Sequence, residues 1–394
     1  PGDVINPIRR ILPQCRVVSG RLEAVEAGAH RIIVRRRQGT LLTLHYDQLI
    51  LAPFLQPNLD FAPGIMAHAC NIDSVGDALH IRERIVHLIE DAELADDPAE
   101  RARLLTIAVI GSGQRACATA VEVAAWLRTA AASYPVLEEN GWQVWQYEDT
   151  DTPYSDFEAL IHARRNRELV KAGVRLGHSD RVASLTDRAL LLSSGERRPL
   201  GLVINASFRQ PSVQVDGGNV RWPPSIDGNL SLTGYPDIWV PTTDEADRHR
   251  FLTLADLAAQ GRAAGHNAWA RSQGYSPRHH RLRRRLLKPY NMGRRSLYGV
   301  GGWLLSGMPA WLLSRLSNLA ELPGLERNLR ILIDWLLDIP FRNDIAVVAP
   351  DRTERLQRSH HAAGDVVIAE GDVGDTAYIV NTGRLAVLKD GIEV

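Results

Sequence analysis

Short hydrophobic runs alternate with helix-like spacing along most of the chain, and this pattern predicts a mixed α/β fold. Residues 104–110 predict an almost unbroken apolar strand, which a glycine-rich turn joins to a helix that ends near residue 132. Before it, the pattern predicts short strands at residues 15–18, 31–35, 41–45 and 48–52, a helix at 76–91 and an acidic linker at 91–103. After it, the pattern predicts strands at 143–148, 174–176 and 202–204, a hairpin at 182–192, and helices at 157–172 and 251–270. This alternation is typical of a βαβ-type domain.

The pattern changes beyond residue 271. Residues 278–295 are crowded with arginine, and residues 298–338 carry tryptophan, leucine and glycine, with many apolar residues at helical spacing. From about residue 346 the chain reads as short strands with regularly spaced glycines. We therefore expect an α/β core, then a helical segment, then an all-β module.

Composition narrows the classes of function. The chain has 394 residues, which is long enough for two or three domains. Its composition, 45% hydrophobic and 23% charged residues, is typical of globular proteins. The formal net charge is zero, so nothing global indicates nucleic acid as a partner. The three cysteines are scattered without a CxxC pair, which argues against a disulfide scaffold and a zinc site and suits a reducing compartment. We expect no metal site.

The strongest chemical signal is the turn after the strand at 104–110. Gly111 and Gly113 allow a tight turn whose backbone can approach a diphosphate, and the following helix N-terminus supplies N–H donors. Ala116 stands where the third glycine of a GxGxxG turn would be. Glu148 ends the next strand, where a carboxylate accepts from ribose hydroxyls and favours NADH over NADPH. The alternative is a glycine turn needed only for packing.

Several stretches together resemble the type II NADH dehydrogenase family, single-chain flavoproteins of the pyridine-nucleotide oxidoreductase fold. They are residues 46–52 (the segment that closes the FAD half), Pro63-Gly64 with residues 71–84, residues 105–127 (the NADH motif), residues 255–267 and residues 301–342. The likeness covers about residues 1–345. It implies two Rossmann-like domains, hydride transfer from NADH to FAD, and reduction of a membrane quinone.

The resemblance also implies a domain plan. An FAD-binding half is expected at residues 1–75 and 200–270, an NADH-binding domain at 76–199, and basic, amphipathic membrane-facing helices at 271–345. The first FAD-binding glycine loop of the family would lie before residue 1. We therefore expect both ends of the sequence to be cut and the FAD half to be incomplete.

The family's functional residues transfer unevenly. Gln260, in the helix that lies near quinone and flavin, is one implied catalytic residue. The family's carboxylate is absent at Ala118, and Glu122 could replace it only through a one-turn insertion. Asp244 is the implied flavin contact, displaced by one residue. Glycines expected at Pro53-Phe54, Ser207 and Thr242 are replaced, which should weaken flavin binding.

Residues 278–338 combine an arginine cluster with a tryptophan- and leucine-rich stretch. With the resemblance, this predicts attachment to an anionic membrane surface, so the implied location is cytoplasmic and peripheral at the inner face of the membrane. The alternative is a pair of core helices with a solvated arginine face. A nucleic-acid interface is disfavoured because no aromatic residues interleave the arginines.

Residues 360–391 look like the first half of a cyclic-nucleotide-binding jelly roll. Gly371, Gly374 and Gly383 fall at expected turns, and alternating apolar residues supply its core. We expect a partial jelly roll at 346–394, which suggests regulation by a cyclic nucleotide. The phosphate-binding segment of cyclic-nucleotide-binding domains would come after residue 394. The rival to an active enzyme is a catalytically degenerate flavoprotein fold that acts as a membrane-docked scaffold or sensor. A third reading keeps the flavin but uses an acceptor other than a quinone.

Overall fold

The computed structural model describes residues 8–149, 156–177, 180–247, 252–281, 287–300 and 303–322, with short pieces at 328–329, 331–333, 335, 367, 383–384, 386–389 and 392–393. The chain divides into two compact units, Pro1–Ala346 and Val347–Val394. In the second unit, two strands of two residues each are described, β22 (Leu388–Lys389) and β23 (Ile392–Glu393), which pair as an antiparallel hairpin. Most of the predicted jelly roll, including Gly371 and Gly374, lies outside the described residues, so that prediction stays a prediction.

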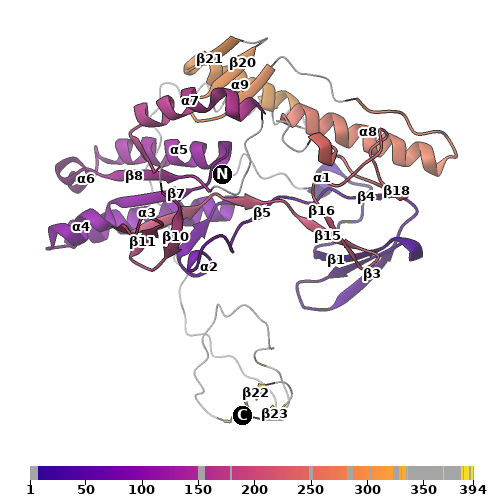
Figure 1. The fold of residues 1–394 in the computed structure, drawn as a ribbon, viewed down its shortest axis with the longest axis horizontal. Helices are drawn as coiled ribbons and strands as arrows, with labels where there is room; N and C mark the ends of the chain where they lie inside the picture. The colour runs from indigo at the N-terminus through magenta and orange to yellow at the C-terminus, as the bar shows by residue number, and fades with distance from the viewer. Residues whose placement is uncertain are drawn as a thin grey trace. The chain divides into compact units, whose positions relative to one another are not determined.

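One lobe of the first unit is built on a five-stranded parallel sheet (Figure 1). Its order is β6 (Ala69–Asn71), β13 (Leu202–Asn205), β7 (Thr106–Ile110), β8 (Gln143–Tyr147) and β9 (Val174–Leu176). β7 is buried at every position, as expected for a strand covered on both faces. Strands β6 and β13 belong to this sheet although they lie outside the range 76–199 that we expected for the nucleotide domain.

Helices cover one face of this sheet. They are α3 (Val75–Leu94), α5 (Gln114–Ala130) and α7 (Asp156–Lys171), with the shorter α4 (Pro98–Leu104) and α6 (Pro135–Asn140) beside them. Ile107 and Val109 of β7 join the same hydrophobic cluster as these helices. Ala108 and Ile110 point to the other face, which packs against α2 (Ile65–His68) and an antiparallel sheet of β10 (Val182–Leu185), β11 (Ala189–Leu192) and β12 (Arg197–Pro199).

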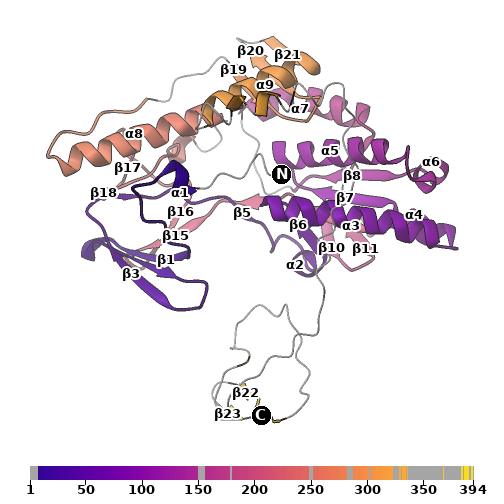
Figure 2. The ribbon, with the colours of Figure 1, turned by 180° about the vertical axis from the view of Figure 1, so that it is seen from behind.

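A second lobe of this unit is mostly antiparallel (Figure 2). One sheet has the order β16 (Gly218–Arg221), β15 (Ser212–Val215), β1 (Arg21–Glu26), β2 (Arg31–Arg35) and β3 (Leu41–His45). Another joins β17 (Ser231–Leu232), β18 (Tyr235–Trp239) and β4 (Leu49–Ile50), and α8 (Leu254–Ser272) packs on β18 and β4. A ribbon of β5 (Gln56–Pro57) and β14 (Phe208–Arg209) lies between the lobes in both views. Three further short pieces are the helix α1 (Ile8–Ile11) and the 3-10 turns η1 (Ala27–Ala29) and η2 (Glu245–Asp247).

The predicted helical segment at 271–345 is only partly helical, which corrects our expectation. An antiparallel sheet of β19 (Leu287–Tyr290), β20 (Leu297–Val300) and β21 (Trp303–Ser306) precedes the helix α9 (Met308–Glu321). Gly299 and Gly307 weaken a helix here, whereas tyrosine, valine and tryptophan suit a pleated, half-buried surface. Tyr290, Met292 and Leu297 join the hydrophobic cluster that contains α5 and α7.

Two predictions near the N-terminal half were also wrong. Residues 15–18 form no strand, and the first strand is β1 at Arg21–Glu26. The expected linker at 91–103 is largely helical, because α3 continues to Leu94 and α4 starts at Pro98. Asp97 accepts a hydrogen bond from the Ala99 N–H and caps α4, and Pro98 occupies its first turn, so the start signal was present in the sequence.

Among the described residues, no helix combines the length and the apolarity needed to cross a bilayer.

Candidate dinucleotide site and the α8 helix

The turn between β7 and α5 needs a glycine at position 111. The backbone of Gly111 has φ +143°, and a Cβ placed there would come within 2.8 Å of the Ala206 carbonyl oxygen and 2.9 Å of the Ala116 Cβ. Ala116 is fully buried, so its small side chain matters for the same contact. Gly111 and Ala116 therefore let α5 start close against the end of β13, with Ala116 at the position of the third glycine of a GxGxxG turn.

Gly113, unlike Gly111, has space for a side chain. Its φ of −82° suits any residue, and it is the N-cap of α5 with no side-chain hydrogen bond to cap the helix. A Cβ at Gly113 would meet only Glu158 Oε1, at 3.8 Å. The backbone N–H groups at the start of this 17-residue helix are therefore not capped by the side chain of the preceding residue. Such a helix start suits the diphosphate of a dinucleotide.

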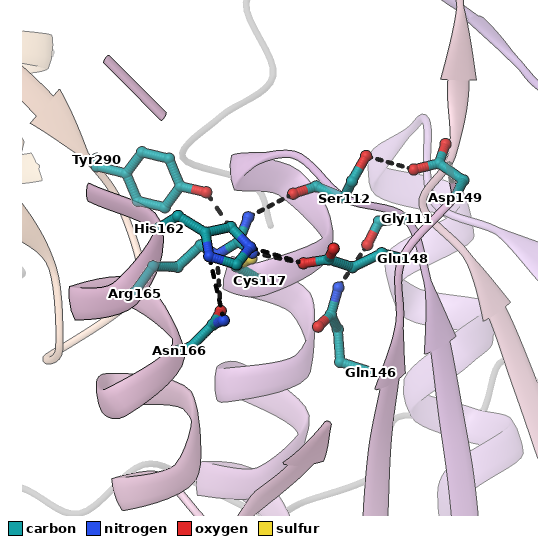
Figure 3. Close-up of polar contacts among 10 residues, drawn as sticks. All are labelled: Gly111, Ser112, Cys117, Gln146, Glu148, Asp149, His162, Arg165, Asn166 and Tyr290. Atoms are coloured by element: carbon teal, nitrogen blue, oxygen red, sulfur yellow. Dashed lines mark hydrogen bonds and ion pairs between the residues drawn. The ribbon is translucent and has the colours of Figure 1, made fainter. Parts of the chain in front are cut away.

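Glu148 lies just after β8, close to this turn (Figure 3). The guanidinium of Arg165, from α7, donates through Nη1 to the Ser112 carbonyl oxygen at 2.9 Å and through Nη2 to Glu148 Oε1 at 2.5 Å. Because one planar group contacts both, the Glu148 carboxylate faces the glycine turn. Arg165 is 0% exposed, whereas the Glu148 side chain keeps 22% of its surface exposed. Sequence reasoning identified Glu148 but missed Arg165.

Two more residues of α7 complete a closed ring with this ion pair. Arg165 Nε donates to Asn166 Oδ1 at 3.1 Å, and Asn166 Nδ2 lies 3.4 Å from His162 Nδ1. His162 Nε2 lies 3.4 Å from Glu148 Oε1. Since Asn166 turns its amide nitrogen to Nδ1, we assign the tautomer of His162 that carries its hydrogen on Nε2, and that hydrogen points to Glu148.

The ends of three strands are tied together beside the ring. Asp149 is buried and accepts hydrogen bonds from Ser112 Oγ and from Ser207 Oγ. Gln146 Nε2 donates to the Gly111 carbonyl oxygen at 2.6 Å. Ser207 follows β13, at a position where a glycine was expected from the resemblance. The serine thus helps Asp149 form a bridge across the carboxyl ends of β13, β7 and β8, where ligands of open α/β sheets bind.

Arg115 extends the mouth of this site toward β14. Its guanidinium lies 3.8 Å above the Phe208 ring and 3.5 Å from Asp73 Oδ1. Partial burial lowers the pKa of Arg115, and Asp73 opposes that change. Arg115 and Asp149 were not among the predicted site residues. Their partners are distant in sequence, and only the fold brings them together.

Gln260 lies apart from this site, on α8. It is 0% exposed, and neither its Oε1 nor its Nε2 has a hydrogen-bond partner among the described residues. A buried amide without a partner is unfavourable unless a ligand or water satisfies it. Asp244 lies in the same lobe, and its Oδ1 accepts a long hydrogen bond of 3.5 Å from the Ile226 N–H.

Glu122, the other predicted catalytic residue, lies on α5 beside the segment after β19. Its carboxylate occupies the space that a Cβ at Gly293 would fill. Desolvation raises the pKa of Glu122, and Arg315 and Arg294 oppose the increase. In the part of the chain that is described, no hydrogen bond or ion pair joins Glu122 to Gln260 or to the glycine turn.

Other candidate chemistry is weak. Burial raises the pKa of Cys117 to about 11, and the thiol lies 3.8 Å from the Tyr290 hydroxyl, so it is not a reactive thiolate. Within the described ranges, no group of three or more histidine, cysteine or acidic side chains is placed to hold a metal ion.

Sequence comparison finds relatives of one kind. The chain is 24% identical over 265 residues to the type II NADH:quinone oxidoreductase NdhA of Mycobacterium tuberculosis, a match that covers 61% of this chain and 54% of that protein. It is 27% identical over 215 residues to the external alternative NAD(P)H-ubiquinone oxidoreductase B4 of Arabidopsis thaliana, covering 52% of this chain and 36% of that protein. The matched part thus spans about half or less of these relatives. No family model matches the chain.

Comparison with solved structures agrees on the fold. NDH2 of Plasmodium falciparum, solved with NADH, superposes with a TM-score of 0.65 at 12% identity and covers 84% of this chain and 85% of that one. The sulfide:quinone oxidoreductase of Aquifex aeolicus gives a TM-score of 0.59 at 13% identity, over 87% of this chain and 84% of that one. The sequence is therefore similar to type II NADH:quinone oxidoreductases, and the fold is similar to that of NDH2.

Proposed function

We propose that this chain belongs to an FAD-dependent oxidoreductase that takes a hydride from NADH and passes two electrons to a quinone. One observation carries the proposal: an uncapped helix start at Gly113 and the carboxylate of Glu148 face the same turn at the carboxyl ends of parallel strands. This pairing suits a diphosphate and the adjoining adenosine ribose. The sequence relatives support the choice of electron donor and acceptor.

Each residue of the turn has a defined part in this proposal. Gly111 and Ala116 bring α5 close to the sheet, and Gly113 leaves the first amides of α5 open to the diphosphate. A carboxylate can accept about four hydrogen bonds. Oε1 of Glu148 faces Arg165 and His162, so acceptor sites remain on the carboxylate for the ribose hydroxyls.

The second lobe would hold FAD, with Gln260 and Asp244 as its contacts. The fit is supported by the buried amide of Gln260, whose donor and acceptor both lack partners among the described residues. A flavin edge offers both kinds of partner. When bound, FAD supplies the two-electron chemistry that no side chain provides.

A membrane quinone requires the protein to reach a lipid surface. The exposed faces of β21 and α9 carry large apolar side chains, among them Trp303, Leu304, Leu305, Met308, Leu312, Leu313 and Leu316. Trp303 is 82% exposed. The arginine-rich residues 278–295 precede this patch in the chain. An apolar patch next to basic residues suits the interface of an anionic leaflet, so we propose peripheral attachment through β21 and α9.

Visible absorption of the purified protein tests the proposal. We expect a bound flavin whose absorption bleaches on anaerobic addition of NADH and recovers on addition of a soluble quinone. A flavin that NADH does not bleach would contradict the proposed electron donor. Bleaching without recovery would contradict only the quinone as acceptor.

The second candidate is a degenerate flavoprotein fold that serves as a membrane-docked scaffold or sensor. The Asp149 bridge favours it, since Ser112 and Ser207 tie together strand ends at the edge of the sheet where a dinucleotide would bind. Colourless protein that does not bind NADH, in the same measurement, would support this candidate over the first.

A further inference from the structure

The proposed function leaves one buried group unexplained, the guanidinium of Arg165. It is fully buried, it comes from α7 and not from the glycine turn, and it spends two donors on the turn and on Glu148. An arginine buried only for packing would not need to join these two groups. The bond to the Ser112 carbonyl fixes the middle residue of the turn, and the bond to Glu148 fixes the carboxylate next to it (Figure 3).

The charge of Arg165 also changes what Glu148 can do. A free carboxylate at the end of the second strand repels the 2′-phosphate of NADPH and thereby selects NADH. Here a buried guanidinium at 2.5 Å neutralises that carboxylate, and the Nε2–H of His162 adds a second donor at 3.4 Å. Hydrogen-bond acceptance toward ribose hydroxyls remains, whereas most of the repulsion of a phosphate is removed.

We propose that Arg165 is a positioning and specificity-determining residue: it holds Glu148 against the glycine turn and lets the site accept NADPH as well as NADH. The inference rests on the proposed function, because it assumes that the turn binds a nicotinamide dinucleotide. It replaces the simple expectation that Glu148 alone selects NADH.

Equilibrium binding of NADH and NADPH to the purified protein tests this inference, with Arg165→Met as the main variant. Methionine fills a similar volume without charge, so Glu148 keeps its negative charge but loses the buried guanidinium that neutralises it. We expect both coenzymes to bind more weakly, with NADPH losing about tenfold more affinity than NADH. A purely structural role of Arg165 would weaken both coenzymes equally, which would overturn the inference.

Three further variants keep the test sound. Arg167→Met is the matched control, because Arg167 lies on the same helix, is exposed, and donates to the Ala163 carbonyl of its own helix; it should leave both affinities unchanged. Arg165→Lys keeps the charge but not the two-armed geometry, so both affinities should fall while their ratio stays near that of wild type. Glu148→Gln leaves Arg165 without its counter-charge and should shift the preference toward NADPH.

The outcomes separate the inference from the proposed function. If Arg165→Met does not fold, the two affinities of the wild-type protein decide: an NADPH affinity within about tenfold of the NADH affinity supports the inference, and strong discrimination against NADPH overturns it. Wild-type protein that binds NADH, with variants whose NADH-to-NADPH ratio does not move, contradicts only the role of Arg165. Wild-type protein that binds neither coenzyme contradicts both.

Discussion

The two glycines of one turn are required for different reasons. Gly111 lies where any side chain would meet the Ala206 carbonyl and the Ala116 methyl, in a backbone conformation that side chains disfavour. We therefore predict that Gly111→Ala lowers the free energy of unfolding by roughly 2–4 kcal/mol, because either the backbone or α5 must shift. Urea unfolding of the variant and the wild type measures this difference.

Gly113→Ala provides the matched comparison in the same turn. The position has an ordinary φ and space for a methyl group, so the free energy of unfolding should change by less than about 1 kcal/mol. The methyl group would lie where the diphosphate must approach, and NADH affinity should fall at least about tenfold. Unchanged NADH affinity in a folded Gly113→Ala protein would mean that the turn serves packing alone.

Ser207 marks a departure from the glycine expected at its position. Ser207→Gly removes a hydroxyl that donates to buried Asp149, so the protein should lose about 1–2 kcal/mol of stability. The same change opens the bridge between β13 and the neighbouring strand ends. We predict tighter NADH binding, by several-fold, in a titration of the purified variant. Equal or weaker binding would show that the Asp149 bridge does not restrict NADH binding.

At the residue scale, the sequence indicated the groups that lie on one continuous stretch. Gly111, Gly113 and Ala116 follow a buried strand, and Glu148 ends the next strand, so their approximate places follow from the strand–turn–helix order. Arg165 could not be found in this way. It is one of two adjacent arginines on α7, and only the packing of that helix decides which of them is buried against Glu148.

At the scale of elements, the long helices and several short strands, such as β2, β3 and β9, were predicted well, whereas the sheet that precedes α9 was missed. The helices expected at 76–91, 157–172 and 251–270 correspond to α3, α7 and α8 with ends shifted by a few residues. The β19–β21 sheet was missed because Trp303 and the leucines of its strands also fit a helical spacing. Its partner surface, the cluster shared with α5 and α7, is far away in sequence and gives no local signal.

The docking of α4 should depend on pH. Glu100 accepts from Arg103 of its own helix and from Arg188 near β11, and Arg103 also donates to the Leu200 carbonyl. The hydrogen bond from Arg103 and the charge of Arg188 lower the pKa of Glu100 from 4.5 to about 2. Since the folded-state pKa is depressed, this contribution to stability is present above pH 4.5 and is lost as the pH falls toward 2.

We predict that Glu100→Gln is less stable than wild type at neutral pH and that the difference shrinks as the pH falls below 4.5. Thermal unfolding at a series of pH values measures it. Glu139→Gln, at an exposed glutamate of α6, is the control and should follow the wild type throughout. A wild-type advantage that does not depend on pH would contradict the role assigned to the Glu100 ion pairs.

The first unit as a whole combines a lobe built on the parallel sheet, a second lobe with α8, and the apolar patch of β21 and α9. We predict that the protein sediments with vesicles that contain anionic lipid and that replacing Trp303 and Leu305 by serine reduces the bound fraction several-fold. Leu94→Ser, at an exposed leucine of α3, is the control. Binding that is unaffected by the double change would place the membrane contact elsewhere.

A crystal structure of the protein grown with NADH would test the proposed dinucleotide site. We expect the diphosphate within hydrogen-bond distance of the amides at the start of α5 and the adenosine ribose hydroxyls bound to Glu148. Arg165 should still donate to the Ser112 carbonyl. Saturating NADH that leaves the Gly111–Gly113 turn empty, or that binds at another place on the protein, would contradict the proposed site.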